Sequence, residues 1–435
     1  MLNKLFNLQE LGTNVKREIL AGLTTFLTMA YIIVVNPLVL GDAGFPMDGV
    51  LFATVLVAGI SSIFMGLYAK LPIALAPGMG LNAFVAYTLV LGMGLSWQTA
   101  LAAVFVSGVV FILLSLPGIN IREAIVNAVP TGVRTGVAAG IGLFLALIGM
   151  INAGVVVSSP ATVLAFGGFN PTFVLFLIGL VVTGFLLTKR VPGALVLSIL
   201  VTSVVAFVFQ QLGLVSGVVF VPEAVFALPS FETVFQLDLF GLFTAGILAP
   251  IFALLFADMF DSISTFMGVT KAADLLDEDG NPRNAGRAML VDGISTTVSG
   301  LAGSSPGTAY IESAAGVEQG GRSGLTAVVA GLLFLPFMFM APLLGFIPSV
   351  ATAPILVVVG LFMISTLRDV DWSDYANTIP AFVAMIAIPF TYSISQGIIL
   401  GFLTYVLIRV LNGRFNEIQP MLWVIFALSV LMLFI

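Results

Sequence analysis

The sequence predicts an all-α polytopic membrane protein with fourteen membrane-spanning segments, arranged as two inverted repeats of seven. Of its 435 residues, 60% are hydrophobic and only 8% are charged, which is more apolar surface than a soluble domain can bury. Apolar runs of about 20 residues recur along the whole chain, as helices that cross a bilayer require. These runs do not alternate polar with apolar residues, so a transmembrane β-barrel is excluded.

The predicted spans follow one another with short polar gaps between them. They cover residues 18–39, 49–69, 73–91, 96–116, 131–152, 172–188, 193–212, 239–270, 287–302, 304–319, 323–345, 349–367, 378–393 and 395–412. A last apolar stretch, 420–435, has only sixteen residues. We expect it to lie in the membrane interface, to re-enter the membrane or to pack on the bundle.

The basic residues predict the orientation of these spans. With the N-terminus in the cytoplasm, all fifteen Lys and Arg residues fall on the cytoplasmic side. The outward gaps contain none, in agreement with the positive-inside rule. One span more or fewer would break this pattern from that point on. We therefore expect a multi-pass protein of the cell's inner (plasma) membrane, embedded in the lipid bilayer, with a cytoplasmic N-terminus.

The composition excludes several kinds of chemistry. The chain has no Cys and no His, which rules out disulfides, thiol catalysis and imidazole metal sites, and we expect neither a metal nor a cofactor. A membrane-embedded aspartyl protease would need acids from two facing helices, whereas Asp258 and Asp261 lie one turn apart on one helix. The polar gaps are too short for a soluble domain. We expect no enzyme activity and no nucleic-acid partner.

Two halves of seven spans flank the outer loop 213–238. Because seven is odd, the second half starts on the opposite side of the membrane, as an inverted repeat requires. Pro77-Gly78 and Pro306-Gly307 interrupt the third and tenth spans at matching places. Such paired interruptions are the best sequence indication of a transporter's binding site, and a plain packing kink is the alternative.

Irregular backbone at membrane depth must be buried in protein or line a cavity. We therefore expect short extended segments at 73–77 and 305–310, in spans 3 and 10. Half-helices should follow them, starting near Gly78 and Ile311. Their free N–H groups and positive dipole ends would face a common point at the midplane.

Acidic residues inside apolar spans mark the candidate site. Asp258 and Asp261 lie in the eighth span, and Glu312 follows the break in the tenth. Acids are costly in hydrocarbon, so an intramembrane carboxylate is by default a candidate functional group. A structural pair bonded to hydroxyls or backbone is the alternative for the two Asp residues. The substrate-binding candidates are Asp261, Glu312, Asn82, Phe84, Tyr310, Ala309 and Gly78; the coupling candidates are Glu312, Asp258 and Asp292.

Several of these candidates have a second interpretation. Asn82 could bind the solute or cap its half-helix. Phe84 and Tyr310 could stack on a ring, or they could belong to the 37 Phe and 7 Tyr residues that serve ordinary packing. Asp292 is either a coupling residue or a packing partner. Tyr31 of the first span is a weaker candidate.

Four long motifs make the chain similar to a known family: Gly22–Pro37, Ala76–Phe84, Asp258–Thr265 and Tyr310–Leu325. In these motifs the chain resembles the AzgA-like purine (adenine/guanine/hypoxanthine) permeases of the nucleobase–cation symporter-2 family. The resemblance implies a secondary active transporter that imports a purine nucleobase with protons rather than Na⁺. It also implies a homodimer.

The same resemblance implies that a core domain (spans 1–4 and 8–11) moves against a gate domain (spans 5–7 and 12–14). In related uracil carriers, one acid in the eighth span and one in the tenth hold the base, and Asp261 and Glu312 match these positions. The expected boundaries are 1–117 (core), 118–216 (gate), 217–238 (extracellular loop), 239–345 (core), 346–413 (gate) and 414–435 (C-terminal apolar segment).

Two departures from the family pattern lie beside the expected site. Family members usually have Asp-Thr-Ile-Gly-Thr where this chain has Asp-Ser-Ile-Ser-Thr at 261–265. Many have Thr-Val-Thr-Thr where it has Pro-Gly-Thr-Ala at 306–309. The resemblance thus predicts the purine class but not the individual base. An anion or other small-solute carrier or channel is the alternative, although it would favour basic or neutral residues where this chain has acids.

Overall fold

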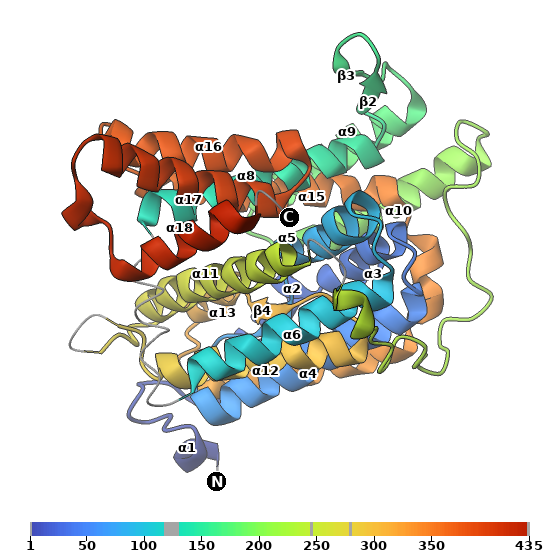
Figure 1. Cartoon of the computed structure of the whole chain (residues 1–435). Helices are drawn as coiled ribbons and strands as arrows, with labels where there is room; N and C mark the ends of the chain where they lie inside the picture. Colours follow the sequence, from blue (N-terminus) through green and yellow to red (C-terminus); the bar gives the residue numbers. More distant parts are fainter. Residues whose placement is uncertain (1, 117–129, 244–246, 278–280, 433–435) are drawn as a thin grey trace.

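The computed structural model describes residues 2–116, 130–243, 247–277 and 281–432, which are mostly helical (Figure 1). The α-helices are α1 (Leu2–Leu5), α2 (Val15–Met29), α3 (Ile32–Asp42), α4 (Met47–Phe64), α5 (Met79–Ala83), α6 (Trp97–Ser115), α8 (Thr131–Asn152), α9 (Pro171–Thr188), α10 (Ala194–Gln211), α11 (Leu248–Ala272), α12 (Ala285–Ala302), α13 (Ser313–Glu318), α14 (Gly324–Phe334), α15 (Ser349–Ile364), α16 (Tyr375–Thr391), α17 (Ile394–Leu411) and α18 (Pro420–Met432). The π-helical segments are η1 (Met65–Ala69) and η2 (Phe84–Gly92); the 3-10 segments are η3 (Phe240–Phe243), η4 (Leu335–Phe339), η5 (Ala341–Phe346), η6 (Ser365–Asp369) and η7 (Phe415–Glu417). The strands are β1 (Leu75–Pro77), β2 (Val156–Ser159), β3 (Val163–Phe166) and β4 (Gly307–Ala309).

Each predicted span corresponds to helical or strand–helix structure. Within the described residues, nine helical stretches are long and apolar enough to cross a membrane, and they match spans 1, 2, 4–8, 12 and 14. Shorter apolar helices match the third, eleventh and thirteenth spans. Helix α12 matches the ninth span, and β4 with α13 matches the tenth. The helical membrane class is confirmed, while the count of fourteen crossings stays a prediction.

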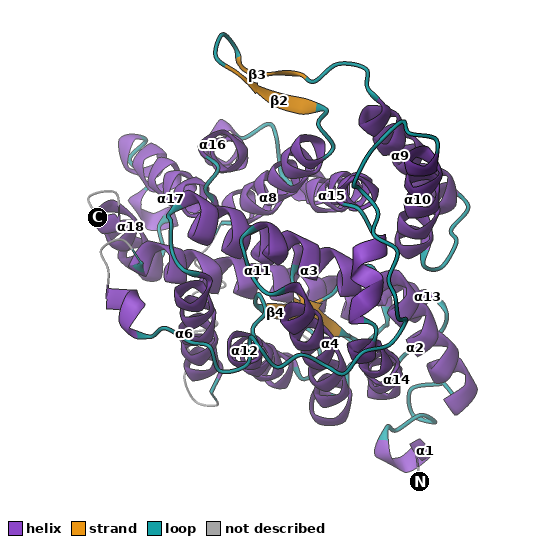
Figure 2. Ribbon diagram, turned by 90° about the vertical axis from the view of Figure 1, so that its right-hand side faces the viewer, coloured by secondary structure: helices purple, strands orange, loops and turns teal. Residues whose placement is uncertain are grey.

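Three local features differ from the expectation. The outer gap 153–171 contains the hairpin β2–β3, which projects from the bundle (Figure 2). The eighth span begins with the short 3-10 segment η3, and its helix starts only at Leu248. The eleventh span leaves the α-helical path after Phe334 and continues as η4 and η5. Pro336 and Pro342 cause that last change, because each lacks the N–H that an α-helix would use.

Strands β1 and β4 form a two-stranded antiparallel sheet inside the bundle. Leu75 is opposite Ala309, and Pro77 is opposite Gly307. All the residues of both strands are buried, and Figure 2 shows β4 surrounded by helices. The sheet satisfies backbone groups that could not be exposed to lipid. The expected extended segments of the third and tenth spans are therefore present, and they pair with each other.

The helix packing agrees with the expected repeat of two halves. If each span of the first half corresponds to the span seven places later, every contact should have a counterpart. Helices α9 and α10 pack together, as do their counterparts α16 and α17. The contact of α6 with α12 has its counterpart in the contact of α14 with α4. The contact of α8 with α16 has its counterpart in the contact of α15 with α9. In Figure 1, α8, α16 and α17, from spans expected to form the gate, lie above α11. Helices α4, α6 and α12, from spans expected to form the core, lie below it.

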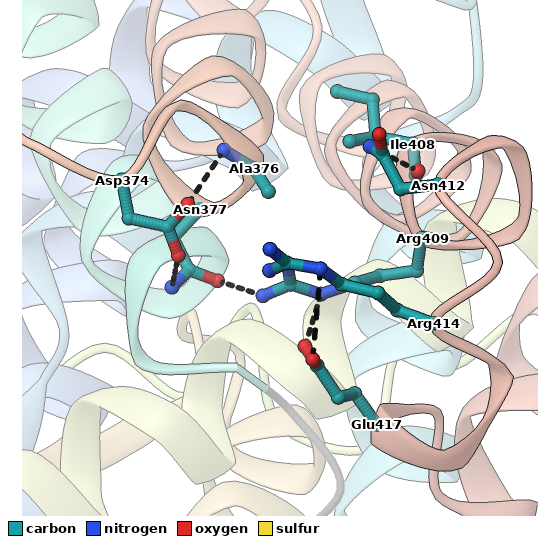
Figure 3. A network of polar contacts seen from close by, with 8 residues as sticks. All are labelled: Asp374, Ala376, Asn377, Ile408, Arg409, Asn412, Arg414 and Glu417. Atoms are coloured by element: carbon teal, nitrogen blue, oxygen red, sulfur yellow. Dashed lines mark hydrogen bonds and ion pairs between the residues drawn. The ribbon is translucent and has the colours of Figure 1, made fainter.

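The C-terminal apolar stretch forms helix α18, which packs on α17 and α11. A polar network holds the segment before it, as Figure 3 shows. The buried guanidinium of Arg409 donates to Asn377 Oδ1 at 2.6 Å and lies 3.1 Å from Glu417 Oε2. Asn377 in turn donates to Asp374 Oδ2 at 2.7 Å. Of the three placements expected for this stretch, the structure shows packing on the bundle.

Candidate functional site

A cavity of about 400 Å³ lies between helices of the spans expected to form the core and helices of the spans expected to form the gate. The core contributes residues from the α2–α3 junction, Gly78 and α5, α11, β4 and the turn that leads from β4 into α13. The gate contributes residues from α8, α15 and η6. Five of the sequence-predicted binding residues line it: Gly78, Asp261, Ala309, Tyr310 and Glu312. The cavity thus gathers both interrupted spans and two of the intramembrane acids.

The two cavity carboxylates are held by hydroxyl groups. Tyr31 donates its O–H to Glu312 Oε1 at 2.7 Å, and Thr308 of β4 donates to Asp261 Oδ2 at 3.3 Å. Asp261 remains exposed to the cavity, and Glu312 is partly exposed. Each carboxylate has spare lone pairs for a solute, since an ionised carboxylate accepts about four hydrogen bonds. Tyr31, a weak candidate from the sequence, therefore positions one of the principal acids.

The backbone near the breaks is more occupied than we expected. The Gly78 N–H, expected to be free for a solute, donates to Pro306 O at 2.8 Å. The Tyr310 N–H donates to Ala74 O at 3.0 Å, and the Tyr310 hydroxyl donates to the Pro77 carbonyl. These bonds fix the two half-spans to each other. The Tyr310 ring is consequently held at the cavity wall with its polar end already satisfied.

The other two acids lie behind the strands. Asp258 is buried and accepts a hydrogen bond from Thr296 of α12 at 2.6 Å. Asp292 is fully buried, with Ser262 and Ala309 as polar neighbours. Within the described residues, neither oxygen of Asp292 makes a hydrogen bond of standard geometry. Asp258 and Asp261 therefore point in different directions from α11, one toward α12 and the other into the cavity.

Asn82 and Phe84 lie outside the residues that line the cavity. Phe84 is completely buried in the core. Asn82 donates its Nδ2 to Asn36 Oδ1 at 3.1 Å, and Asn36 donates to Thr54 Oγ1 at 2.7 Å and to Ser304 Oγ at 2.9 Å. This buried network joins spans 1, 2, 3 and 10. Asn82 therefore contributes to the structure next to the site, and it does not line the cavity.

The gate side of the cavity contains polar residues that the sequence analysis did not select. Thr131, Arg134 and Thr135 come from the first turns of α8, and Ser365 and Thr366 come from η6. Their only sequence signal is polarity at the end of a span. Span ends are commonly polar because they approach the membrane interface, so this signal does not separate a cavity wall from an ordinary helix end.

The comparisons with known proteins agree with this geometry. Residues 16–400 match the model of a family described as the permease family. This chain belongs to that permease family. The adenine permease AdeP of Escherichia coli is 41% identical over 432 residues, covering 99% of this permease and 95% of AdeP. The guanine/hypoxanthine permease PbuO of Bacillus subtilis is 39% identical over 443 residues, covering 99% of this permease and 100% of PbuO.

Solved structures support the same architecture. The transmembrane domain of the cyanobacterial bicarbonate transporter BicA superposes with a TM-score of 0.64 at 18% identity, covering 90% of this permease and 97% of that chain. The anion transporter Slc26a9 of mouse superposes with a TM-score of 0.65 at 11% identity. The match covers 92% of this permease and 69% of the Slc26a9 chain. At these identities the likeness concerns the fold. The permease thus shares the fold of these membrane transporters.

Proposed function

We propose that this permease is a secondary active transporter that imports purine nucleobases, such as adenine, guanine or hypoxanthine, with protons. The observation that carries the proposal is the meeting of Asp261 and Glu312 in one cavity beside the paired strands. The names of AdeP and PbuO, which align over almost their full lengths, support the substrate class. The transport step is a movement of the core helices against the gate helices.

A purine suits this cavity chemically. Its ring N–H groups would donate to the carboxylates of Asp261 and Glu312, which are the strong acceptors available there. Tyr31 and Thr308 hold those carboxylates in place. The ring of Tyr310 offers an aromatic wall for a flat heterocycle. An anion would instead approach two carboxylates, so the acids favour an uncharged substrate over the anions that proteins of similar fold carry.

The domain boundaries, the dimer and the orientation belong to the same proposal. The core comprises 1–117 and 239–345, and the gate comprises 118–216 and 346–413. The boundary between 117 and 118 lies outside the described residues. The permease works as a homodimer in the cell's inner membrane, with its N-terminus in the cytoplasm. The positive-inside pattern of the sequence supports this orientation.

Uptake into proteoliposomes tests the function. An inward proton gradient should drive accumulation of labelled adenine or hypoxanthine above its external concentration, and a protonophore should abolish that accumulation. Chloride and sulfate flux, measured in the same vesicles, should stay at the level of empty liposomes. Anion flux without purine uptake would replace the proposal by the alternative of an anion carrier.

Proton coupling is proposed to use Glu312 at the cavity and the buried carboxyls Asp258 and Asp292 behind it. Buried acids in transporters commonly form proton relays. Ser262 connects the cavity with the buried carboxyls, because it follows Asp261 in the chain and is a polar neighbour of Asp292. A proton on this cluster would remove a buried negative charge next to β4, which carries two cavity residues.

The variant Asp292→Asn should uncouple purine movement from the proton gradient. The amide cannot exchange a proton, so accumulation against a gradient should fall to equilibration, while exchange of labelled for unlabelled purine should continue. Counterflow and gradient-driven uptake are measured in the same proteoliposomes. Asp274→Asn, at an exposed acid just beyond the end of α11, is the matched control. Gradient-driven accumulation at the wild-type level in the Asp292→Asn variant would exclude this role.

A further inference from the structure

The two ends of helix α8 have different environments. Thr131 and Arg134, at its beginning, line the cavity. Asn152 is its last residue, about 30 Å away along the axis at the usual helical rise. Ile311 and Asp261 are exposed where the cavity reaches solvent, and Ile311 has 47% of its surface accessible. The cavity is therefore open toward the end of the gate where α8 begins.

At the other end of α8, a polar cluster connects the gate to the core. Tyr87 of η2 donates its hydroxyl to Asp42 Oδ2 at 2.7 Å. Asn152 of α8 donates its Nδ2 to the same Asp42 oxygen at 3.3 Å and to the Tyr87 hydroxyl oxygen at 3.4 Å. Asp42 and Tyr87 belong to core spans, whereas Asn152 belongs to a gate span. Asp42 Oδ2 therefore accepts one hydrogen bond from the core and one from the gate.

A second contact across the same seam lies nearby. Thr88, the neighbour of Tyr87, donates its hydroxyl to the Tyr392 carbonyl of the gate at 3.4 Å. The Tyr392 ring packs edge-on against Phe144 of α8, with their centroids 4.9 Å apart. Phe144 is completely buried, and Tyr87 is 7% exposed. Polar bonds thus join the core to the gate at the end opposite the cavity mouth, and the Tyr392–Phe144 ring contact fixes the gate side of this seam.

The core and gate also touch closely at the limit of the cavity nearest to this closed end, where Gly80 and Ile141 belong to its lining. A Cβ built on Gly80 of α5 would lie 2.6 Å from Ile141 Cγ2 of α8. There is no room for a solute at this point without separation of the two helices. A substrate in the cavity can therefore leave toward the far side only if α8 moves away from the core, and that movement must break the Asn152 contacts.

We propose that Asp42, Tyr87 and Asn152 form an outer gate whose hydrogen bonds hold the far side closed and separate once in each transport cycle. The proposal rests on the proposed function, since it assigns the residues that must part when core and gate move. Asn152 is the positioning residue on the gate side, and it is not among the residues that line the cavity. By the orientation expected from the sequence, this end of the bundle is the extracellular one.

Cross-linking tests the outer gate, and the chain has no native Cys to interfere. The double variant Asp42→Cys/Asn152→Cys is reacted with a short bifunctional methanethiosulfonate, which joins the two thiols through bonds that a reductant can break. Gradient-driven purine uptake should fall at least about tenfold when the two bodies are joined, because movement of the gate is blocked. Reduction should restore uptake. Purine binding, measured by thermal shift, should survive because the cavity stays open.

Joining two residues of the same body provides the matched control. Asp42→Cys/Tyr87→Cys places both thiols in the core, and its uptake should be the same before and after the linker reacts. The single variants control for loss of each side chain. Full uptake by a double variant whose core–gate link is verified by mass spectrometry would overturn the proposal. Failure of the linker to join the two thiols of the Asp42→Cys/Asn152→Cys variant would overturn the geometry. Lack of purine uptake by the unmodified wild type would instead contradict the proposed function.

Discussion

Replacement of Asp261 by Asn is expected to weaken purine binding at least about tenfold and to abolish uptake, while the protein stays folded. The carboxylate is exposed to the cavity, and its Oδ2 accepts from Thr308 at 3.3 Å, so its remaining lone pairs are available to ring N–H groups. A hydrogen bond to a charged acceptor contributes about 1.5–3 kcal/mol, and Asn replaces one acceptor by a donor that would oppose a ring N–H. Binding is measured by thermal shift and by equilibrium binding of labelled purine.

Asp274→Asn is the control for this variant, because it makes the same substitution at an exposed position just beyond α11. Its purine affinity and uptake should equal those of the wild type. Glu312→Gln should behave like Asp261→Asn, because it too replaces a cavity carboxylate, here the one that accepts from the Tyr31 hydroxyl, by an amide. Wild-type purine affinity in the Asp261→Asn variant would remove this residue from the site.

The second large effect is expected at the crossing of spans 2 and 11. Gly66 and Gly324 bring the two backbones together, and a Cβ on Gly324 would collide with the Gly66 carbonyl oxygen. Small residues allow such close approach of helices in membranes. Gly324→Leu should therefore force the helices apart, costing about 3 kcal/mol or more of stability. The expected result is a lower melting temperature and a lower yield of monodisperse protein in detergent.

Gly184→Leu is the matched control for this substitution. Gly184 lies within helix α9, and apart from its chain neighbours and the adjoining backbone of α9, no described atom comes within 4 Å of a Cβ built on it. Its added side chain meets open space, so the melting temperature should stay close to that of the wild type. Equal melting temperatures for the Gly324→Leu and Gly184→Leu variants would show that the crossing tolerates separation.

Much of the architecture follows from local sequence patterns and could therefore be predicted. The apolar runs placed the helices because a bilayer demands uninterrupted backbone bonding over a known thickness. The Pro-Gly pairs predicted where that bonding is interrupted, and β1 and β4 occur at those places. The sequence indicates Asp261 and Glu312 as site residues because a charge in hydrocarbon is costly and is usually kept only for function. Both of them line the cavity.

The remaining features depend on which span ends meet, and periodicity carries no such information. Nothing in the segment around Tyr31 indicates that its hydroxyl reaches Glu312, far along the chain. Asn82 follows the first break as a solute ligand would, yet its side chain turns to Asn36. The strands of the hairpin β2–β3 show no regular alternation of polar and apolar side chains, so the sequence of this gap between spans does not indicate strands.

The pairing of β1 with β4 also has a consequence for biosynthesis. The ribosome delivers β1 early and its partner only after most of the later spans have been made. During that interval the N–H and C=O groups of β1 have no strand to bond, and lipid offers no substitute. The nascent third span must therefore be kept beside water or another chain at the insertion machinery. An N-terminal fragment ending before span 10 should be a substrate for quality-control proteases.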